Sequence, residues 1–203
     1  MKSDREYRTL NLEVEKREEG EPSYIVRGYA STFEPYVLWT TEEGVDIKEV
    51  IDPDAFKEAD LSDVVFRVDH EGAVYARSSA GTLEIGVDDH GLFDKADLSK
   101  TARARALFED IAAGNYPKQS FAFSVAEDSY DKTTHTRTIR KIAKVYDVSP
   151  VSFPANPTTE LDIATRNFIN GVIDGEKAER LENEKRSKAK ARLELKIKLM
   201  ESE

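Results

Sequence analysis

The feature that most constrains the fold is a repeated alternation of apolar and polar residues in short segments. In residues 118–125 the large apolar side chains take every second position: Phe121, Phe123 and Val125. The small side chains between them face the other way: Ser120, Ala122 and Ser124. This two-residue period predicts a β-strand with one buried face, which begins after the Gly-Asn-Tyr-Pro turn at residues 114–117.

Similar segments recur through the first 165 residues. We expect strands at residues 6–18, 23–32, 45–51, 64–70, 81–87, 91–98, 118–125 and 137–148. The first two of these strands, and those at residues 81–87 and 91–98, are expected to form hairpins, and Glu71-Gly72 is expected to be a turn. Residues 151–157 contain two prolines and are expected to be extended. Helices are expected at residues 52–61, with Asp52 as the N-cap, and at residues 101–113, with Ser99 or Thr101 as the N-cap. A loop is expected at residues 33–44. Many short strands with few helices predict an α+β domain over residues 1–165, a mainly antiparallel β-barrel that is closed or nearly closed and flanked by short helices.

The composition changes near residue 165. From Glu176 onward nearly every residue is charged, and no apolar stripe long enough for a second core is visible. Residues 166–203 are therefore expected to form a charged tail that is helical or flexible.

Composition also limits the function. The net charge of −10 argues against a protein that binds nucleic acid by neutralising phosphates. The chain has no cysteine, which excludes disulfides, a thiol nucleophile and thiolate metal sites. No run of roughly 18 apolar residues is present, so we expect a soluble, cytoplasmic protein without a membrane partner.

Two residues have the surroundings that a nucleophile and its base require. Ser120 stands at the start of a strand whose other face is apolar, where it would be rigid and exposed. A serine nucleophile needs a base, and His70 is the only histidine at the end of an apolar strand. Ser124 shares the face of Ser120 and is the rival nucleophile, although it lies deeper in its strand.

The third member of such a site is open on the residues alone. Asp69 is adjacent to His70, but neighbours on a strand point to opposite faces, so it is a poor orienting group. Asp147 lies near the end of a late strand, on the expected face of Val145 and Ser149, and is the better candidate. His90 and His135, which we expect in solvated connections, are the remaining alternatives. The histidines are not spaced as metal ligands, and we expect neither a metal nor another cofactor.

Five stretches, taken in order, resemble the prohead (capsid-maturation) serine proteases of tailed bacteriophages. They are residues 49–56 (EVIDPDAF), 68–70 (VDH), 88–92 (DDHGL), 114–123 (GNYPKQSFAF) and 147–157 (DVSPVSFPANP). The resemblance covers about residues 5–160. It implies a fold similar to the herpesvirus assemblin proteases, with Ser120 as the nucleophile and His70 as the base.

The chain departs from this family pattern at three places. Asp54 stands where glycine is frequent, Phe121-Ala122-Phe123 replaces the commoner Ile-Gly-Phe, and Asp147 stands where glutamate is frequent. The last change keeps the charge and shortens the side chain that would orient His70.

The resemblance also implies a biological role. Proteases of this family are enclosed in the immature capsid (the prohead) in the host cytoplasm, where they cleave the major capsid protein's scaffolding segment, or the scaffold, and commonly themselves. On this basis residues 166–203 are expected to be a packaging or self-cleavage segment. The assemblin comparison raises self-association into a dimer. The alternative is a non-enzymatic β-barrel scaffold module that binds capsid protein, with Ser120 structural.

Overall fold

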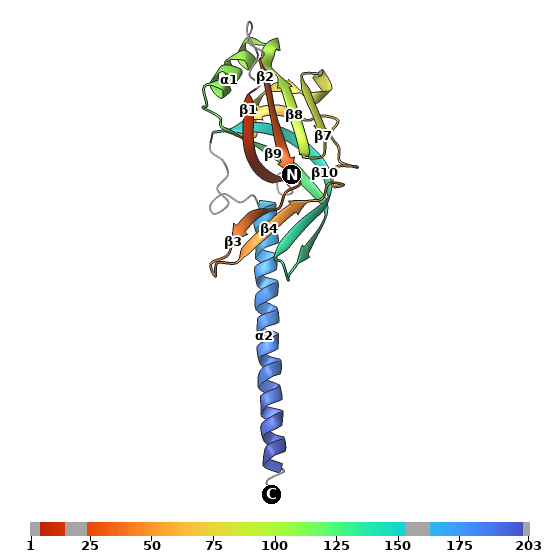
Figure 1. The fold of residues 1–203 in the computed structure, drawn as a ribbon, viewed down its shortest axis with the longest axis vertical. Helices are drawn as coiled ribbons and strands as arrows, with labels where there is room; N and C mark the ends of the chain where they lie inside the picture. Colours follow the sequence, from red (N-terminus) through yellow and green to blue (C-terminus); the bar gives the residue numbers. More distant parts are fainter. Residues whose placement is uncertain (1–4, 15–23, 153–162, 201–203) are drawn as a thin grey trace. The chain divides into compact units, whose positions relative to one another are not determined.

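The computed structural model describes residues 5–14, 24–152 and 163–200, and it divides into two units, Met1–Ala164 and Thr165–Glu203. The first unit contains all the described strands, shown with their connections in Figure 1. They are β1 (Glu6–Val14), β2 (Ile25–Thr32), β3 (Tyr36–Thr40), β4 (Asp46–Ile51), β5 (Val65–Val68), β6 (Glu71–Arg77), β7 (Leu83–Val87), β8 (Gly91–Asp97), β9 (Lys118–Asp131) and β10 (Thr136–Val151). Helix α1 (Ala102–Ala112) lies between β8 and β9 in the chain. The expected α+β class is confirmed.

The strands form one strongly curved, mostly antiparallel sheet. Its order is β3-β4-β10-β9-β1-β2-β8-β7. Outside this path, β5 pairs with β10 and with β6. The β4–β10 and β5–β10 pairings are parallel, and so is an isolated bridge between Asp60 and Lys144. Among the described strands the path ends at β3 and β7 without a pairing between them, so barrel closure stays a prediction.

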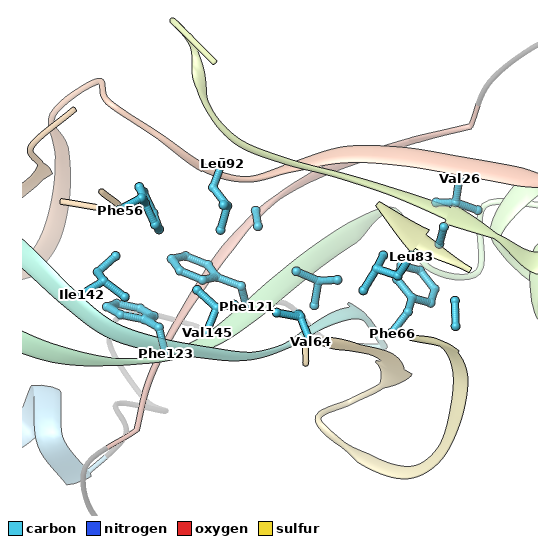
Figure 2. Packing of buried hydrophobic residues seen from close by; sticks show 14 of the residues in the cluster. Val26, Phe56, Val64, Phe66, Leu83, Leu92, Phe121, Phe123, Ile142 and Val145 are labelled. Atoms are coloured by element: carbon cyan, nitrogen blue, oxygen red, sulfur yellow. The ribbon is translucent and has the colours of Figure 1, made fainter. Parts of the chain in front are cut away.

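Strand β9 lies near the middle of this sheet and separates two environments. Phe121 and Phe123 stack with ring centroids 4.5 Å apart and are fully buried in the core. Figure 2 shows both rings in the core beside Val145 of β10, which is also fully buried. The alternation read from residues 118–125 is therefore the division between core and opposite face.

Several local predictions are confirmed. The β1–β2 and β7–β8 pairs are antiparallel, as the hairpin patterns indicate. Helix α1 begins after Thr101, whose Oγ1 accepts a hydrogen bond from the Ala104 backbone N–H at 3.0 Å. Of the extended segment expected at residues 151–157, residues 153–157 lie outside the described residues.

Two other local predictions are wrong. The segment expected as a loop contains strand β3, which pairs with β4. The helix expected at residues 52–61 is a series of turns. Backbone N–H groups of Ala55, Lys57 and Ala59 each donate to the carbonyl three residues earlier. The Asp52 side chain accepts from the Asp54 N–H at 2.9 Å. An aspartate followed by proline suits such a turn as well as a helix start.

A cluster of buried charges joins β1 to β4 and β10. Glu49 accepts hydrogen bonds from Arg8 at 2.6 Å and from Arg137 at 2.9 Å. Arg137 also binds Glu6 through two bonds of 2.6 and 2.8 Å. Burial acts to raise the pKa of Glu6, but bonds and charges from Arg137 and Arg8 outweigh it and hold that pKa at about 2. The paired charges let the Glu6 carboxylate be buried without protonation.

The second unit is dominated by helix α2 (Ile163–Met200). Its surface carries ion pairs at helical spacing, Glu182 with Arg186 at 2.6 Å and Glu184 with Lys188 at 3.7 Å. Neither α1 nor the described part of α2 is both long and apolar enough to span a membrane.

Candidate active site

The face of β9 opposite the phenylalanines carries two rows of side chains that cross three strands. In one row Ala122 pairs with Tyr7 of β1 and with Asp147 of β10. In the next row Ser120 pairs with Thr9 of β1 and with Ser149 of β10. Directly paired residues project to the same face of a sheet, so these six side chains share one surface.

A bulge in β10 is responsible for the direction of Asp147. Val145 pairs with Phe123, but Asp147 pairs with Ala122, so the register shifts between them. Val145 consequently points into the core, while Asp147 points to the opposite face. The expectation that these two residues share a face is wrong, because a bulge inserts an unpaired residue and reverses the alternation after it.

His70 lies in the turn that joins β5 to β6. Asp69 and His70 both have positive φ angles, 49° and 58°, as the central residues of a tight hairpin turn. The histidine is therefore not the last residue of its strand, and Glu71-Gly72, expected as the turn, begins β6.

Asp69 holds this turn against the end of β10. Its backbone N–H donates to the Pro150 carbonyl at 3.1 Å. Its carboxylate accepts from the Ser152 backbone N–H at 2.8 Å and from the Ser152 hydroxyl at 2.7 Å. As expected, Asp69 does not orient the imidazole directly. Instead, it anchors the backbone that carries His70.

The turn brings the imidazole to the carboxylate of Asp147. His70 Nδ1 lies 2.6 Å from Asp147 Oδ1, and Asp147 is only 1% exposed. The Tyr7 ring and the imidazole meet in a T-shaped arrangement, with ring centroids 4.5 Å apart. His70 is accordingly held between Tyr7 and Asp147, above the row that contains Ala122.

Ser149 completes the surroundings of the carboxylate. Its hydroxyl donates to Asp147 Oδ1 at 2.7 Å, and the residue is fully buried. Asp147 therefore accepts two hydrogen bonds on one oxygen, which fixes its orientation toward the imidazole. The sequence pattern indicates that Ser149 is near Asp147, but it does not predict this hydrogen bond, because the contact depends on the bulge.

Ser120 differs from the expected exposed serine. It is 2% exposed, and its Oγ has no hydrogen-bond partner. The structure brings Ser120 to the face on which His70 and Asp147 meet, one row away along β9. Successive residues on one face of a strand are about 7 Å apart, so the two rows are neighbours. The structure contains no hydrogen bond between Ser120 and His70.

The alternative residues lie elsewhere or have other contacts. Ser124 Oγ accepts a hydrogen bond from the Tyr146 hydroxyl at 3.4 Å. His90 is exposed in the β7–β8 turn against Tyr29, and His135 Nδ1 lies 3.1 Å from the Tyr130 hydroxyl. Neither histidine contacts the Asp147 carboxylate.

Other binding features of the chain are separate from this face. A cavity of about 700 Å³ lies over β2, β7 and β8, and Tyr29, His90 and Phe93 are among its lining residues. Ser120, His70 and Asp147 do not line it. Within the described ranges, no group of three or more histidine, aspartate or glutamate side chains is arranged to hold a metal ion.

Comparison with known proteins identifies the family. A family model described as caudovirus prohead serine protease matches residues 10–171, which include His70, Ser120 and Asp147. No curated protein and no solved structure matches the chain significantly. Because the matched residues cover most of the sequence, this chain belongs to the caudovirus prohead serine protease family.

Proposed function

We propose that the chain is a serine endopeptidase in which Ser120 is the nucleophile, His70 the general base and Asp147 the orienting carboxylate. The observation that carries this proposal is the 2.6 Å contact between His70 Nδ1 and the buried Asp147 Oδ1. A buried carboxylate on Nδ1 leaves the proton of the neutral imidazole on that nitrogen and frees Nε2 to accept the serine proton.

The reaction then follows from these positions. His70 Nε2 takes the proton of Ser120 as Oγ attacks the scissile carbonyl carbon. The tetrahedral intermediate collapses, the C–N bond breaks, and His70 gives the proton to the leaving amine. The same imidazole then deprotonates a water molecule, which attacks and hydrolyses the acyl ester. The imidazole gives this proton to the leaving Ser120 oxygen.

The burial of Ser120 indicates how the enzyme is controlled. A peptide carbonyl can reach Oγ only after the surroundings of this 2% exposed residue rearrange. The same rearrangement would bring Oγ within hydrogen-bond distance of Nε2, since catalytic contacts commonly tighten when substrate binds. Such an enzyme is latent as a free chain and becomes active at assembly.

Family membership suggests the substrate and the compartment. The substrate is the scaffolding segment of the major capsid protein, cleaved inside the prohead, and the enzyme also cleaves itself. Residues 166–203, most of which belong to helix α2, serve as a packaging or self-cleavage segment. Mass spectrometry of the enzyme from mature particles tests this last part, because an intact tail in every molecule would contradict it.

The experiment that tests the proposal is co-expression with the capsid protein under assembly conditions. Shortened capsid protein is expected with the wild type and is expected to be lost in Ser120→Ala and His70→Ala. Ser124→Ala is the matched control, since it removes a hydroxyl from the same strand, and it should retain cleavage. Cleavage that survives in Ser120→Ala contradicts the assignment, and loss only in Ser124→Ala moves it to the rival serine. No cleavage by the wild type in assembled particles favours a non-enzymatic scaffold module.

A further inference from the structure

Acyl transfer needs a donor for the negative charge that develops on the scissile carbonyl oxygen, and the backbone N–H groups of Ser120 and Phe121 are not available for this role. Ser120 has a paired strand on each side, Thr9 in β1 and Ser149 in β10. In a central strand the backbone N–H groups point alternately to the two neighbouring strands, where ladder carbonyls accept them. The N–H groups of Ser120 and Phe121 are therefore engaged in the sheet. These two N–H groups therefore cannot form the common type of oxyanion hole, in which backbone N–H groups beside the nucleophile bind the oxyanion.

The direction of the carbonyl groups in β10 shows which of the two neighbours of Ser120, Thr9 or Ser149, has the shorter Cα separation from it. The Pro150 carbonyl accepts from the Asp69 N–H and so points away from β9. Carbonyls alternate along a strand, so that of Ser149 points toward β9, and Ser120–Ser149 is the hydrogen-bonded pair. Thr9–Ser120 is then a non-hydrogen-bonded pair. Such pairs have the shorter Cα separation, about 4.5 Å, and the closer side chains.

Thr9 also has an unused hydroxyl. Among the described residues, the buried side-chain atoms that lack a hydrogen-bond partner include two hydroxyl oxygens, Thr9 Oγ1 and Ser120 Oγ. These two hydroxyls belong to directly paired residues on one face of the sheet. An unpartnered buried hydroxyl costs free energy of folding, and its position beside another one indicates that a ligand supplies the missing contact.

We propose that the Thr9 hydroxyl donates a hydrogen bond to the oxyanion of the tetrahedral intermediate on Ser120. The proposal rests on Ser120 as the nucleophile. As Oγ forms its bond to the carbonyl carbon, the π electrons of the C=O bond move to oxygen, and Thr9 donates a hydrogen bond to that oxygen without transferring its proton. When the intermediate collapses, the C=O bond re-forms and the contact weakens. The donor thus acts on the transition state more than on the bound substrate.

Two other buried donors without partners are less suitably placed. Arg67 Nε belongs to β5, which lies beyond β10 from Ser120, and Arg67 Nη2 is committed to the Gly72 carbonyl at 2.8 Å. Arg5 Nε belongs to a guanidinium that lies 3.9 Å from the centre of the Tyr146 ring. Thr9 alone of the three is paired with Ser120. The family model matches residues 10–171 and therefore does not include Thr9.

The test compares Thr9→Val, which keeps the β-branched shape and removes the hydroxyl, with Thr9→Ser, which keeps the hydroxyl. The full chain is assembled with capsid protein, and the first-order rate of capsid-protein shortening within the particles is measured. Thr9→Val is expected to lower this rate about 10²–10³-fold, the usual effect of losing one oxyanion donor, while Thr9→Ser stays near the wild-type rate. Thr9→Cys, with a weak donor, is expected to be slow and serves as a second variant if the valine variant does not fold.

A second readout separates the oxyanion contact from a structural effect. A peptide boronic acid forms a tetrahedral adduct with a serine nucleophile, so its inhibition should weaken in Thr9→Val by about the same factor as the rate. Melting temperatures of the variants provide the folding control.

The outcomes separate the two proposals. A Thr9→Val enzyme with the wild-type rate, or a Thr9→Ser enzyme as slow as Thr9→Val, overturns the assignment of Thr9 and leaves Ser120 as the nucleophile. Wild-type cleavage that does not depend on Ser120 overturns both.

Discussion

His70 Nδ1 and Asp147 Oδ1 lie 2.6 Å apart, although 77 residues separate them in the chain. Two irregularities in the backbone make this contact. The tight turn with positive φ at His70 directs the imidazole toward β10, and the bulge after Val145 directs Asp147 away from the core. A positive φ is unfavourable for residues other than glycine, and a bulge interrupts the regular hydrogen-bond ladder of a sheet. Both features are nevertheless common at functional sites.

Asp147→Asn should lower the cleavage rate about 10³–10⁴-fold while the fold is kept. The amide has nearly the same shape, but its NH₂ group facing Nδ1 favours the tautomer with the proton on Nε2, which cannot accept the Ser120 proton. The measurement is the rate of capsid-protein shortening in assembled particles, with circular dichroism as the folding control. Asp147→Glu keeps the charge and should retain more activity than Asp147→Asn. If the two variants were equally active, orientation by the carboxylate would be refuted.

Asp69→Ala should lower the cleavage rate by releasing the turn that carries His70. The substitution removes the two bonds from Ser152 and places alanine at a φ of 49°, a region that costs roughly 1 kcal/mol or more for an ordinary side chain. Asp69→Asn is the matched control, because asparagine tolerates this region and its side-chain oxygen can accept one of the two bonds. Rates from both variants at equal particle occupancy decide the question. An alanine variant as fast as the asparagine variant would show that the anchor is unnecessary.

The parts of the fold that could be predicted from sequence are those set by neighbours in the chain. Helix α1 with its Thr101 cap, the β7–β8 hairpin and the two faces of β9 follow from spacing and turn residues within each segment. Strand β3 was missed because it is an edge strand that depends on its pairing with β4. The turns after Asp52 were missed because its side chain can cap a turn or a helix equally well.

The candidate site was predictable in its residue types and not in its geometry. A strand serine, a histidine beside a turn and a late aspartate can be recognised as candidates in the sequence. Their placement depends on register between distant strands, and a shift of one residue reverses the face of every side chain that follows. For that reason the sequence could not predict the direction of Asp147, the hydrogen bond from Ser149, or the pairing of Thr9 with Ser120.

Arg137→Met should destabilise the protein by about 3–5 kcal/mol. Arg137 is buried and binds both Glu6 and Glu49, so its removal takes one of two buried arginines, Arg137 and Arg8, away from both carboxylates. Lys141→Met is the matched control on the same strand. Its ion pairs with Glu58 and Glu127 are long, 3.8 and 3.9 Å, and half exposed, so it should cost less than about 1 kcal/mol. Urea unfolding of both variants measures the difference, and equal costs would contradict a structural role for the buried cluster.

Asp94 of β8 is expected to make the stability of the protein depend on pH. The residue is 1% exposed, and Gln119 Nε2 donates to its Oδ1 at 2.7 Å. Burial raises the pKa of the Asp94 carboxyl to about 7, against the smaller, opposite effect of the Gln119 bond. Asp94 Oδ2 and Gln119 Oε1 both lack a partner, so a proton on Oδ2 provides the donor that this pair of oxygens lacks. Gly28 leaves room for the amide, because a Cβ there would lie 2.3 Å from Gln119 Nε2.

The free energy of unfolding of the wild type should therefore fall as pH rises through the pKa of Asp94. Asp94→Asn should abolish this fall. The unfolded carboxyl ionises near its ordinary value of 3.8 and the folded one near 7, so the folded state holds the extra proton between these values. The contribution of Asp94 to the free energy of unfolding is complete below about pH 4, declines as pH rises through 7, and is constant above it. Three pKa units correspond to roughly 4 kcal/mol. Urea unfolding of both proteins from pH 5 to pH 8.5 provides the measurement, and the difference between them cancels the other titrating groups. The variant should gain stability relative to the wild type as pH rises from 5 to about 7, with no further gain above that pH. A difference that does not change with pH would show that Asp94 is ionised throughout.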